Sequence, residues 1–375
     1  MRTTATHMTA AHTTAARITA VPITREPAMD TRKSAADLTP AERDAFLEAV
    51  VRLKHRPAPG GPAGAGVYDQ FVALHGAVMA VTTPGLPPGE TVNFAHWDIG
   101  FCAWHRKYLI EFEKALQAEV AGVTLPYWDW SRHTDAVNKL FRADFLGSLR
   151  AGSPGPVTDG VLRDPLPPAE RPAWWPAGAE GFPVHPLLEE GFGTSLARGS
   201  VGVGWPPTAA QTTRLEQLVI QQPGVHPLWY FWLVLEQGHD QITSRTHNRG
   251  HNFIGGHMSG AFSPNDPVFW LHHANVDRLW ANWQKRRQAA VPGSTHEDHY
   301  PPGSQLSPFT GSQAPPGHRP DDAMWPWVGG ATGFGVSVDS AVRQLLPDYS
   351  GTPAVTVKEM LDLDALGYRY APPGT

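Results

Sequence analysis

Six histidines in two groups limit the folds open to this chain more than any other feature. They are His75, His96 and His105 in the first group, and His247, His251 and His273 in the second. Imidazole nitrogens suit copper, zinc, iron and nickel. No thiolate or carboxylate stands at matching positions, so two sets of three indicate a pair of metal ions. The sharpest interpretation is a pair of three-histidine copper sites that bind O2 between them, which requires residues 75–273 to fold together.

The size and composition of the chain allow a large core. It has 375 residues, of which 41% are hydrophobic. This length alone favours two or three domains, but a shared metal pocket favours one. We therefore expect a single catalytic domain over residues 31–375. A flexible N-terminal extension, rich in Thr and Ala, is expected at residues 1–30.

Charge and hydropathy argue against several classes of protein. The formal net charge is −5, so no basic footprint points to nucleic acid or to a membrane surface. The N-terminus lacks the continuous apolar segment of a secretory signal, and no run of about 18 apolar residues predicts a membrane span. We expect a cytoplasmic protein, or one exported with a partner protein. The single cysteine, Cys102, excludes an intrachain disulfide framework.

Apolar residues at helical spacing predict four helices that carry histidines. They cover about residues 68–78, 104–120, 247–251 and 268–287. Residues 147 to about 210 are rich in Gly, Pro and Trp without a sustained period, which predicts irregular loops. The expected fold class is mainly α, with a four-helix bundle core that holds a dinuclear copper site and long irregular loops that wrap it.

Local signals predict where two helices begin and how one is anchored. Thr39 can cap a helix that has Pro40 at its first position. Asn265 or Asp266 can cap the helix that begins near residue 268. Asp277, four residues after a histidine of the second group, can anchor that helix to an arginine.

The spacing of the histidines allows each group to converge on one metal ion. His247 and His251 lie four residues apart, so a helix places them on one face with Cβ atoms roughly 5–6 Å apart. His273 from a facing helix can complete that set. In the first group, His96 is expected in a loop and the other two histidines on neighbouring helices. Backbone carbonyls can accept from the second nitrogen of each ring and fix its tautomer.

Several sequence blocks carry a family resemblance. FCAWHRKYLIEFEKALQ, TLPYWDWS, HNRGH and SPNDPVFWLHHANVDRLWANWQ resemble the tyrosinase family of type-3 copper proteins, most closely its actinobacterial members. The resemblance runs from about Arg32 to about Tyr370. It implies that the first histidine group binds one copper ion and the second group the other. His272 precedes the ligand in the His-His pair, since the family pattern places the ligand at the second histidine.

The resemblance also implies roles around the metals. In this family an Asn directly after the first ligand of the second copper, with an upstream Glu, holds a water that helps to deprotonate phenols. Asn248 matches the first and Glu236 the second, although the spacer after Glu236 is longer than usual and an ordinary helix residue is the alternative. The residues expected at the substrate pocket are Gly260, Ala261, Phe262 and His272. A core position is the alternative for the phenylalanine.

The function that the resemblance implies is a copper-dependent phenol oxidase. It would use O2 and two copper ions to ortho-hydroxylate monophenols and to oxidise o-diphenols to o-quinones. A catechol oxidase or an o-aminophenol oxidase with little hydroxylase activity is the first alternative. A haemocyanin-like O2 carrier with a blocked entrance is the second. A single-metal zinc or iron hydrolase is the third, and it lacks an HExxH motif.

The expected partners are a small phenolic substrate and a copper-delivery chaperone of the kind found with related bacterial tyrosinases. The chain ends just after a Tyr-x-Tyr feature, Tyr368 and Tyr370, which closes the core domain of the family. A C-terminal shielding domain is therefore expected to be missing and the site to be open, which argues against an O2 carrier.

Overall fold

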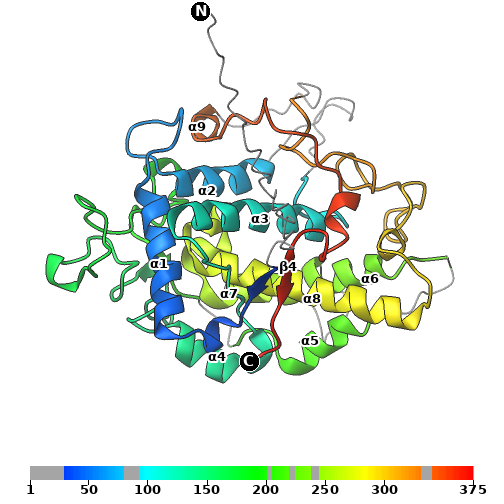
Figure 1. Ribbon diagram of the computed structural model, residues 1–375, viewed down its shortest axis with the longest axis horizontal. Coiled ribbons are helices and arrows are strands. Elements are labelled where there is room, and N and C mark those ends of the chain that lie inside the picture. Colours follow the sequence, from blue (N-terminus) through cyan, green and yellow to red (C-terminus); the bar gives the residue numbers. More distant parts are fainter. Residues whose placement is uncertain are drawn as a thin grey trace, which may run out of the picture.

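Five of the six histidines lie on the helices α2 (Val67–Val78), α3 (Phe101–Glu119), α7 (Thr246–Ile254) and α8 (Val268–Ala290), whose arrangement Figure 1 shows. The computed structural model describes residues 29–79, 93–200, 205–218, 224–237, 245–330 and 340–374. In these ranges the helices are α1 Pro40–His55, α2 Val67–Val78, α3 Phe101–Glu119, α4 His133–Leu140, α5 Ala209–Glu216, α6 Leu228–Trp232, α7 Thr246–Ile254, α8 Val268–Ala290 and α9 Ser340–Arg343. The predicted helical bundle is confirmed.

The packing of these helices brings distant parts of the sequence together. Helix α8 packs against α3 and α7, and α1 packs against α2 and α3. The rings of Phe112 on α3 and Trp270 on α8 stack with their centroids 3.5 Å apart. Both side chains are fully buried, so this contact joins the two longest helices through apolar surface removed from water.

The predicted helix starts are largely confirmed. Thr39 caps α1, since its hydroxyl accepts from the backbone N–H of Glu42 and the Glu42 carboxylate accepts from the Thr39 N–H. At α8 the Asp266 carboxylate accepts from the N–H of Val268 at 3.1 Å. Asn265 instead donates from its side chain to the carbonyl of Leu188.

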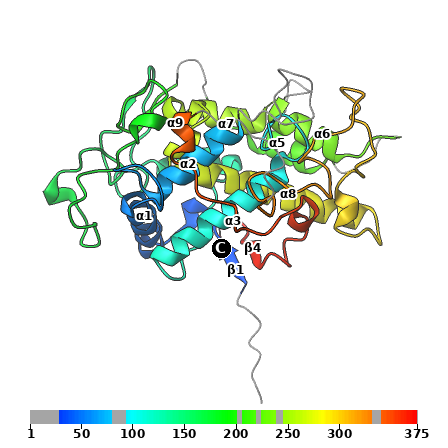
Figure 2. The ribbon, with the colours of Figure 1, turned by 90° about the horizontal axis from the view of Figure 1, so that it is seen from above.

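Irregular segments wrap the helices, as the Gly- and Pro-rich composition predicts. Between α4 and α5 the regular elements of the described residues are short turns and the antiparallel strands β2 (Gly155–Pro156) and β3 (Ala197–Arg198). Figure 2 places this region and α1 at one end of the molecule, and α6 and the end of α8 at the other. Arg198 ties the region to the start of α8, because its guanidinium makes two hydrogen bonds of 2.6 and 2.8 Å with Asp266.

A buried ionic cluster joins the two ends of the described chain. Strands β1 (Asp30–Arg32) and β4 (Tyr368–Tyr370) pair in parallel. The Asp277 carboxylate on α8 accepts from Arg106 Nε at 2.6 Å and from the hydroxyls of Tyr368 and Tyr370, each also at 2.6 Å. Arg32 reaches the same carboxylate at 3.4 Å. The prediction that Asp277 anchors α8 to an arginine is therefore confirmed.

Two predictions about the chain as a whole concern residues that the structure covers in part. A flexible extension was predicted at residues 1–30, and residues 1–28 of it lie outside the described residues. Both the extension and the domain boundary after it therefore stay predictions. Within the described ranges, no helix has the length and apolar character that a bilayer crossing needs.

Candidate dinuclear metal centre

The two predicted histidine groups converge in the interior of the molecule. His75 comes from α2, His105 from α3, and His96 from the loop between them. The ligand atoms of these three lie within 4.8 Å of one another, and so do those of the second group on α7 and α8. All these side chains are buried. Within the described residues these are the two groups of at least three side chains that could hold a metal ion.

Backbone carbonyls orient the first group. His75 Nδ1 donates to the carbonyl oxygen of Ala261 at 2.6 Å, and His105 Nδ1 donates to that of Phe101 at 2.9 Å. The Nε2 atoms of His75 and His96 then lie 3.2 Å apart. Because Nδ1 carries the proton in a ring that donates there, the Nε2 lone pair is left to face the centre of the group.

The second group has the same design. His251 Nδ1 donates to the carbonyl of Met258 at 2.7 Å, and His247 Nδ1 donates to Oδ1 of Asn248 at 2.8 Å. The three Nε2 atoms lie 3.0 Å apart for His251 and His247, and 3.2 Å apart for each of these with His273. The four-residue spacing on α7 therefore brings two rings to one point, and α8 supplies the third.

These residues fit metal ions better than they fit one another. Five of the six rings have their Nδ1 atom bonded, whereas His273 Nδ1 has no hydrogen-bond partner among the described residues. A ring bonded at Nδ1 turns its Nε2 lone pair toward the centre of its group, and several lone pairs at one point without a donor between them are unfavourable in a buried site. A cation removes that repulsion. Burial lowers the pKa of all six rings, that of His96 to about 3 and that of His251 to about 4. The rings are thus neutral near pH 7, the form that binds a metal.

The two groups face each other. The rings of His105 and His273 stack with centroids 4.2 Å apart, and those of His96 and His247 lie 5.7 Å apart. Two ions held by these groups would be neighbours, as the interpretation of a dinuclear site requires.

His272 is a fourth buried imidazole beside the second group. Its ring lies 4.5 Å from that of His251, and its ligand atom falls within the 4.8 Å limit of the group. The Nε2 contacts of 3.0–3.2 Å nevertheless join His247, His251 and His273 and, in the part of the chain that the structure describes, leave out His272. A Cβ on Gly250 would lie 2.2 Å from His272, so α7 approaches this ring very closely.

A pocket of about 240 Å³ opens onto both groups. It is lined by His75, Met79, His96, Trp97, Glu236, His247, Asn248, His251, Asn252, Met258, Ser259, Gly260, Ala261 and Ser263. The predicted residues Asn248, Glu236, Gly260 and Ala261 are thus brought together. Phe262 and His272 are not among the lining residues: the Phe262 ring instead fills the space beside Gly76 of α2, and His272 is fully buried.

Glu236 is bonded directly to the loop of the first group. It follows α6 in the π-turn Leu233–Gln237. Its Oε1 accepts from His96 Nδ1 at 2.9 Å, and its Oε2 accepts from the Trp97 N–H and the Trp232 indole N–H, each at 2.7 Å. Burial raises the pKa of Glu236 to about 8. The alternative interpretation of Glu236 was an ordinary helix residue. These three hydrogen bonds near the first histidine group do not favour that alternative.

Sequence reasoning missed Trp97 at the rim of the pocket. This residue has a φ of 67°, in the left-handed region that non-glycine residues rarely occupy, and its side chain is 59% exposed. The bond from its N–H to Glu236 holds the backbone in this conformation. The sequence could have pointed to Trp97 only through its position next to His96. That position does not reveal the backbone conformation of the residue.

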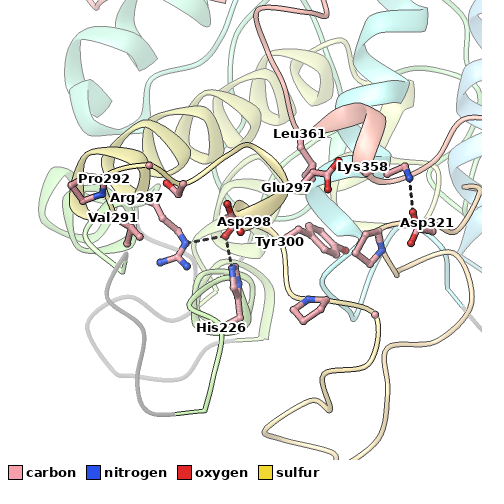
Figure 3. A pocket seen from close by; sticks show the side chains of 15 residues that line it. His226, Arg287, Val291, Pro292, Glu297, Asp298, Tyr300, Asp321, Lys358 and Leu361 are labelled. Carbon is pink, nitrogen blue, oxygen red and sulfur yellow. Dashed lines mark hydrogen bonds and ion pairs between the residues drawn. The ribbon is translucent and has the colours of Figure 1, made fainter.

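A larger cavity lies elsewhere in the molecule. It has a volume of about 760 Å³ and lies beside the end of α8 (Figure 3). Four of its polar side chains are engaged with each other or with the backbone: Lys358 pairs with Asp321 at 2.6 Å, and His226 and Arg287 both donate to the carbonyl of Asp298. The two histidine groups that could hold a metal ion in the described part of the chain do not line this cavity.

Comparison with known proteins agrees with this geometry. Residues 65–286 match the family model for the common central domain of tyrosinase. The tyrosinase of Streptomyces glaucescens is 34% identical over 306 residues, which cover 80% of this chain and 93% of that protein. The chain belongs to the tyrosinase family.

Solved structures extend the tyrosinase likeness to the fold. A polyphenol oxidase mutant from Thermothelomyces thermophila aligns with a TM-score of 0.55 and 23% identity, over 92% of this chain and 89% of that chain. A functional unit of octopus hemocyanin aligns with a TM-score of 0.51 and 17% identity, over 92% of this chain and 68% of that one. The fold alone therefore does not separate these classes of protein.

Membership of the tyrosinase family favours a phenol oxidase over a hemocyanin. The protein is a copper-dependent phenol oxidase with a pair of copper ions as cofactor and O2 as co-substrate. The family, fold class, enzyme class and cofactors predicted from the sequence are confirmed.

Proposed function

We propose that each histidine group binds one copper ion and that the pair oxidises phenols in the adjoining pocket. The six proposed ligands are His75, His96, His105, His247, His251 and His273. The observation that supports this assignment most directly is the convergence of Nε2 atoms in two groups whose rings stack 4.2 Å apart. When bound, the copper pair supplies the activation of O2 and the redox chemistry.

The substrate is a monophenol, which is hydroxylated at the ortho position, or an o-diphenol, which is oxidised to the o-quinone. The chain's own part is to bind the phenol, keep bulk water out and take up the phenolic proton. Asn248 and Glu236 line the same pocket. Since Oδ1 of Asn248 accepts from His247, its amide N–H groups remain to hold a water, which passes the phenolic proton toward the Glu236 carboxylate.

Two variants test this role. Asn248→Ala and Glu236→Gln should lower kcat/KM for tyrosine by about 10²-fold or more, the usual contribution of a positioned base, and lower kcat/KM for catechol much less. Asn138→Ala, at an exposed position of α4, is the matched control and should behave as wild type. Equal losses on both substrates would contradict the role of Asn248, and an unaffected Glu236 variant would mean that another group accepts the proton.

The alternatives to a hydroxylase give different outcomes with three substrates. Copper-loaded protein should turn over tyrosine, catechol and 2-aminophenol. Turnover of the last two without tyrosine would replace the hydroxylase by a catechol oxidase or an o-aminophenol oxidase, and turnover of none would favour an O2 carrier. Metal analysis should return two copper ions per chain, whereas one zinc ion would revive a hydrolase.

Copper delivery by a partner protein is part of the proposal. All six proposed ligands are buried, so a copper ion can reach them only through the pocket or by a local opening. A chaperone that presents the ion at the pocket would remove that barrier, in the cytoplasm or during joint export. Purified metal-free protein should therefore load slowly from copper salts, and rapid unaided uptake of two ions would argue against a chaperone.

A further inference from the structure

One short segment links the pocket to the first histidine group. Residues 259–263, here called the rim segment, contribute Ser259, Gly260, Ala261 and Ser263 to the lining of the pocket. The carbonyl oxygen of Ala261 also accepts from His75 Nδ1 at 2.6 Å. The orientation of the His75 ring therefore depends on where the backbone of the rim segment lies.

The carboxylate of Glu190 is bonded to this backbone from the other side. Its Oε1 accepts from the N–H of Ala261 at 2.8 Å and its Oε2 from the N–H of Phe262 at 3.2 Å. The Ala261 carbonyl and the Phe262 N–H belong to the same planar peptide unit. Glu190 and His75 thus bond to opposite ends of one rigid group, and moving one end moves the other.

The surroundings of Glu190 hold its carboxylate in place. Its backbone has a φ of 48°, which is left-handed and rare outside glycine. Two residues earlier, the carbonyl of the buried Leu188 accepts from the side chain of Asn265 at 2.8 Å. A Cβ on Gly260 would lie 2.2 Å from the Glu190 carboxylate, so the rim segment approaches Glu190 as closely as glycine allows.

We propose that Glu190 is a positioning residue for the first copper ion. By fixing the peptide between Ala261 and Phe262, it holds the carbonyl that orients His75. Glu190 does not touch substrate, copper or the other ligands, and its neighbour in the sequence, Glu189, does not share the role. The proposal rests on the proposed function, because it requires His75 to be a ligand.

The test compares Glu190→Ala and Glu190→Gln with the control Glu189→Ala. The Glu189 side chain makes no hydrogen bond or ion pair with the residues that the structure describes, so its removal causes the same change in charge without the contact. Two readouts are independent of turnover: the chelator concentration that removes each copper ion, and the hydrogen exchange of the amides of residues 261 and 262 in metal-free protein.

The expected result is selective. Glu190→Ala should release one copper ion at about 10-fold lower chelator concentration, in the range seen when outer partners of a ligating histidine are lost, while release of the other ion is unchanged. Exchange at the two amides should rise. Glu190→Gln, which keeps one acceptor and sets an NH2 group against the second N–H, should fall between wild type and Glu190→Ala.

Three outcomes overturn the inference. The first is retention of both copper ions by Glu190→Ala as in wild type, and the second is an equal weakening of both ions, which a loss of general stability would produce. The third is an identical effect of Glu189→Ala. Failure of the proposed function is distinguishable, because wild-type protein would then fail to bind two copper ions at all.

Discussion

At the scale of single residues, the site depends on what occupies the second nitrogen of each imidazole. His75, His105 and His251 donate to backbone carbonyls, whereas His96 and His247 are bonded to the side chains of Glu236 and Asn248. The two side-chain partners are also the residues proposed to move the phenolic proton. A substitution at either position therefore acts on a ligand and on the proton path together, which is why the ratio of two substrates, rather than a single rate, tests their role.

At Gly250 we predict that substitution by alanine destabilises the protein, although helix propensity alone would predict that it stabilises. In an exposed helix interior, Gly→Ala stabilises by up to about 1 kcal/mol. Here the new Cβ would lie 2.2 Å from His272, beside the second histidine group. Gly250→Ala should therefore lower the free energy of unfolding by about 1–3 kcal/mol and weaken the copper bound by the second group, as measured by urea unfolding and chelator titration.

Gly303→Ala is the matched control for this substitution. The nearest atom to its new Cβ lies 3.7 Å away, an ordinary contact distance. It should keep both copper ions with little change in stability. A Gly250→Ala protein as stable as wild type would show that α7 and the ring of His272 can move apart freely.

At the scale of elements, the short helix α6 positions Glu236. Helix α6 is a single turn of α-helix followed by the π-turn that carries Glu236. His226 caps its start: Nδ1 accepts from the N–H of Leu228 at 3.2 Å, and Nε2 donates to the carbonyl of Asp298 at 3.0 Å (Figure 3). Both nitrogens are used by the neutral ring, so protonation would remove the cap.

This geometry predicts a pH dependence of stability. Burial is the main cause that lowers the pKa of His226 from its usual value near 6.5 to about 4, and the charges of Arg287 and His299 act in the same direction, while Asp298 acts in the opposite one. Since the unfolded chain then binds the proton more readily, the contribution of His226 to stability is complete above pH 6.5. It falls between pH 6.5 and 4, by up to about 1.4 kcal/mol per pH unit.

His226→Asn removes this titration and keeps an acceptor for the Leu228 N–H. Urea unfolding of both proteins at several values between pH 7 and 4.5 should show the wild type losing stability more steeply on acidification. Parallel curves would mean that the ring is already protonated in the folded state or titrates at its ordinary pKa.

At the scale of the whole molecule, the ends of the described chain are joined through Asp277. This carboxylate receives Arg106 from α3, Arg32 from β1 and the two tyrosine hydroxyls of β4. It is 2% exposed, so its partners have little access to water as a replacement. The same helix carries His273 of the second histidine group four residues earlier, and the cluster therefore connects the joined chain ends to the position of this ring.

Asp277→Asn should be strongly destabilising. It keeps the shape of the side chain but leaves the buried Arg106 without its carboxylate, a change that typically lowers the free energy of unfolding by about 3–5 kcal/mol. Asp144→Asn, in an exposed pair with Arg142, should change it by no more than about 1 kcal/mol. Thermal and urea unfolding of the two variants would measure the difference, and equal small effects would mean that the cluster is not a main contributor to stability.

The sequence by itself determined the helices and the two histidine groups. Helical periodicity and a four-residue spacing are local properties, so His247 and His251 could be assigned to one face of a helix without knowledge of the fold. The family blocks supported the grouping with His273 and the choice of copper, which the residue types alone had already favoured.

Only the tertiary structure showed which residues far away in the sequence lie against the two histidine groups and the pocket. Glu190 reaches the rim segment across 71 positions of sequence, and no periodicity records such a contact. Whether Phe262 faced the substrate or the core depended on the space beside Gly76 in another helix. The physical reason is the same in both cases: a hydrogen bond or a packing contact is made by atoms that folding brings within a few ångströms, whereas a local pattern reports only what one segment can do alone.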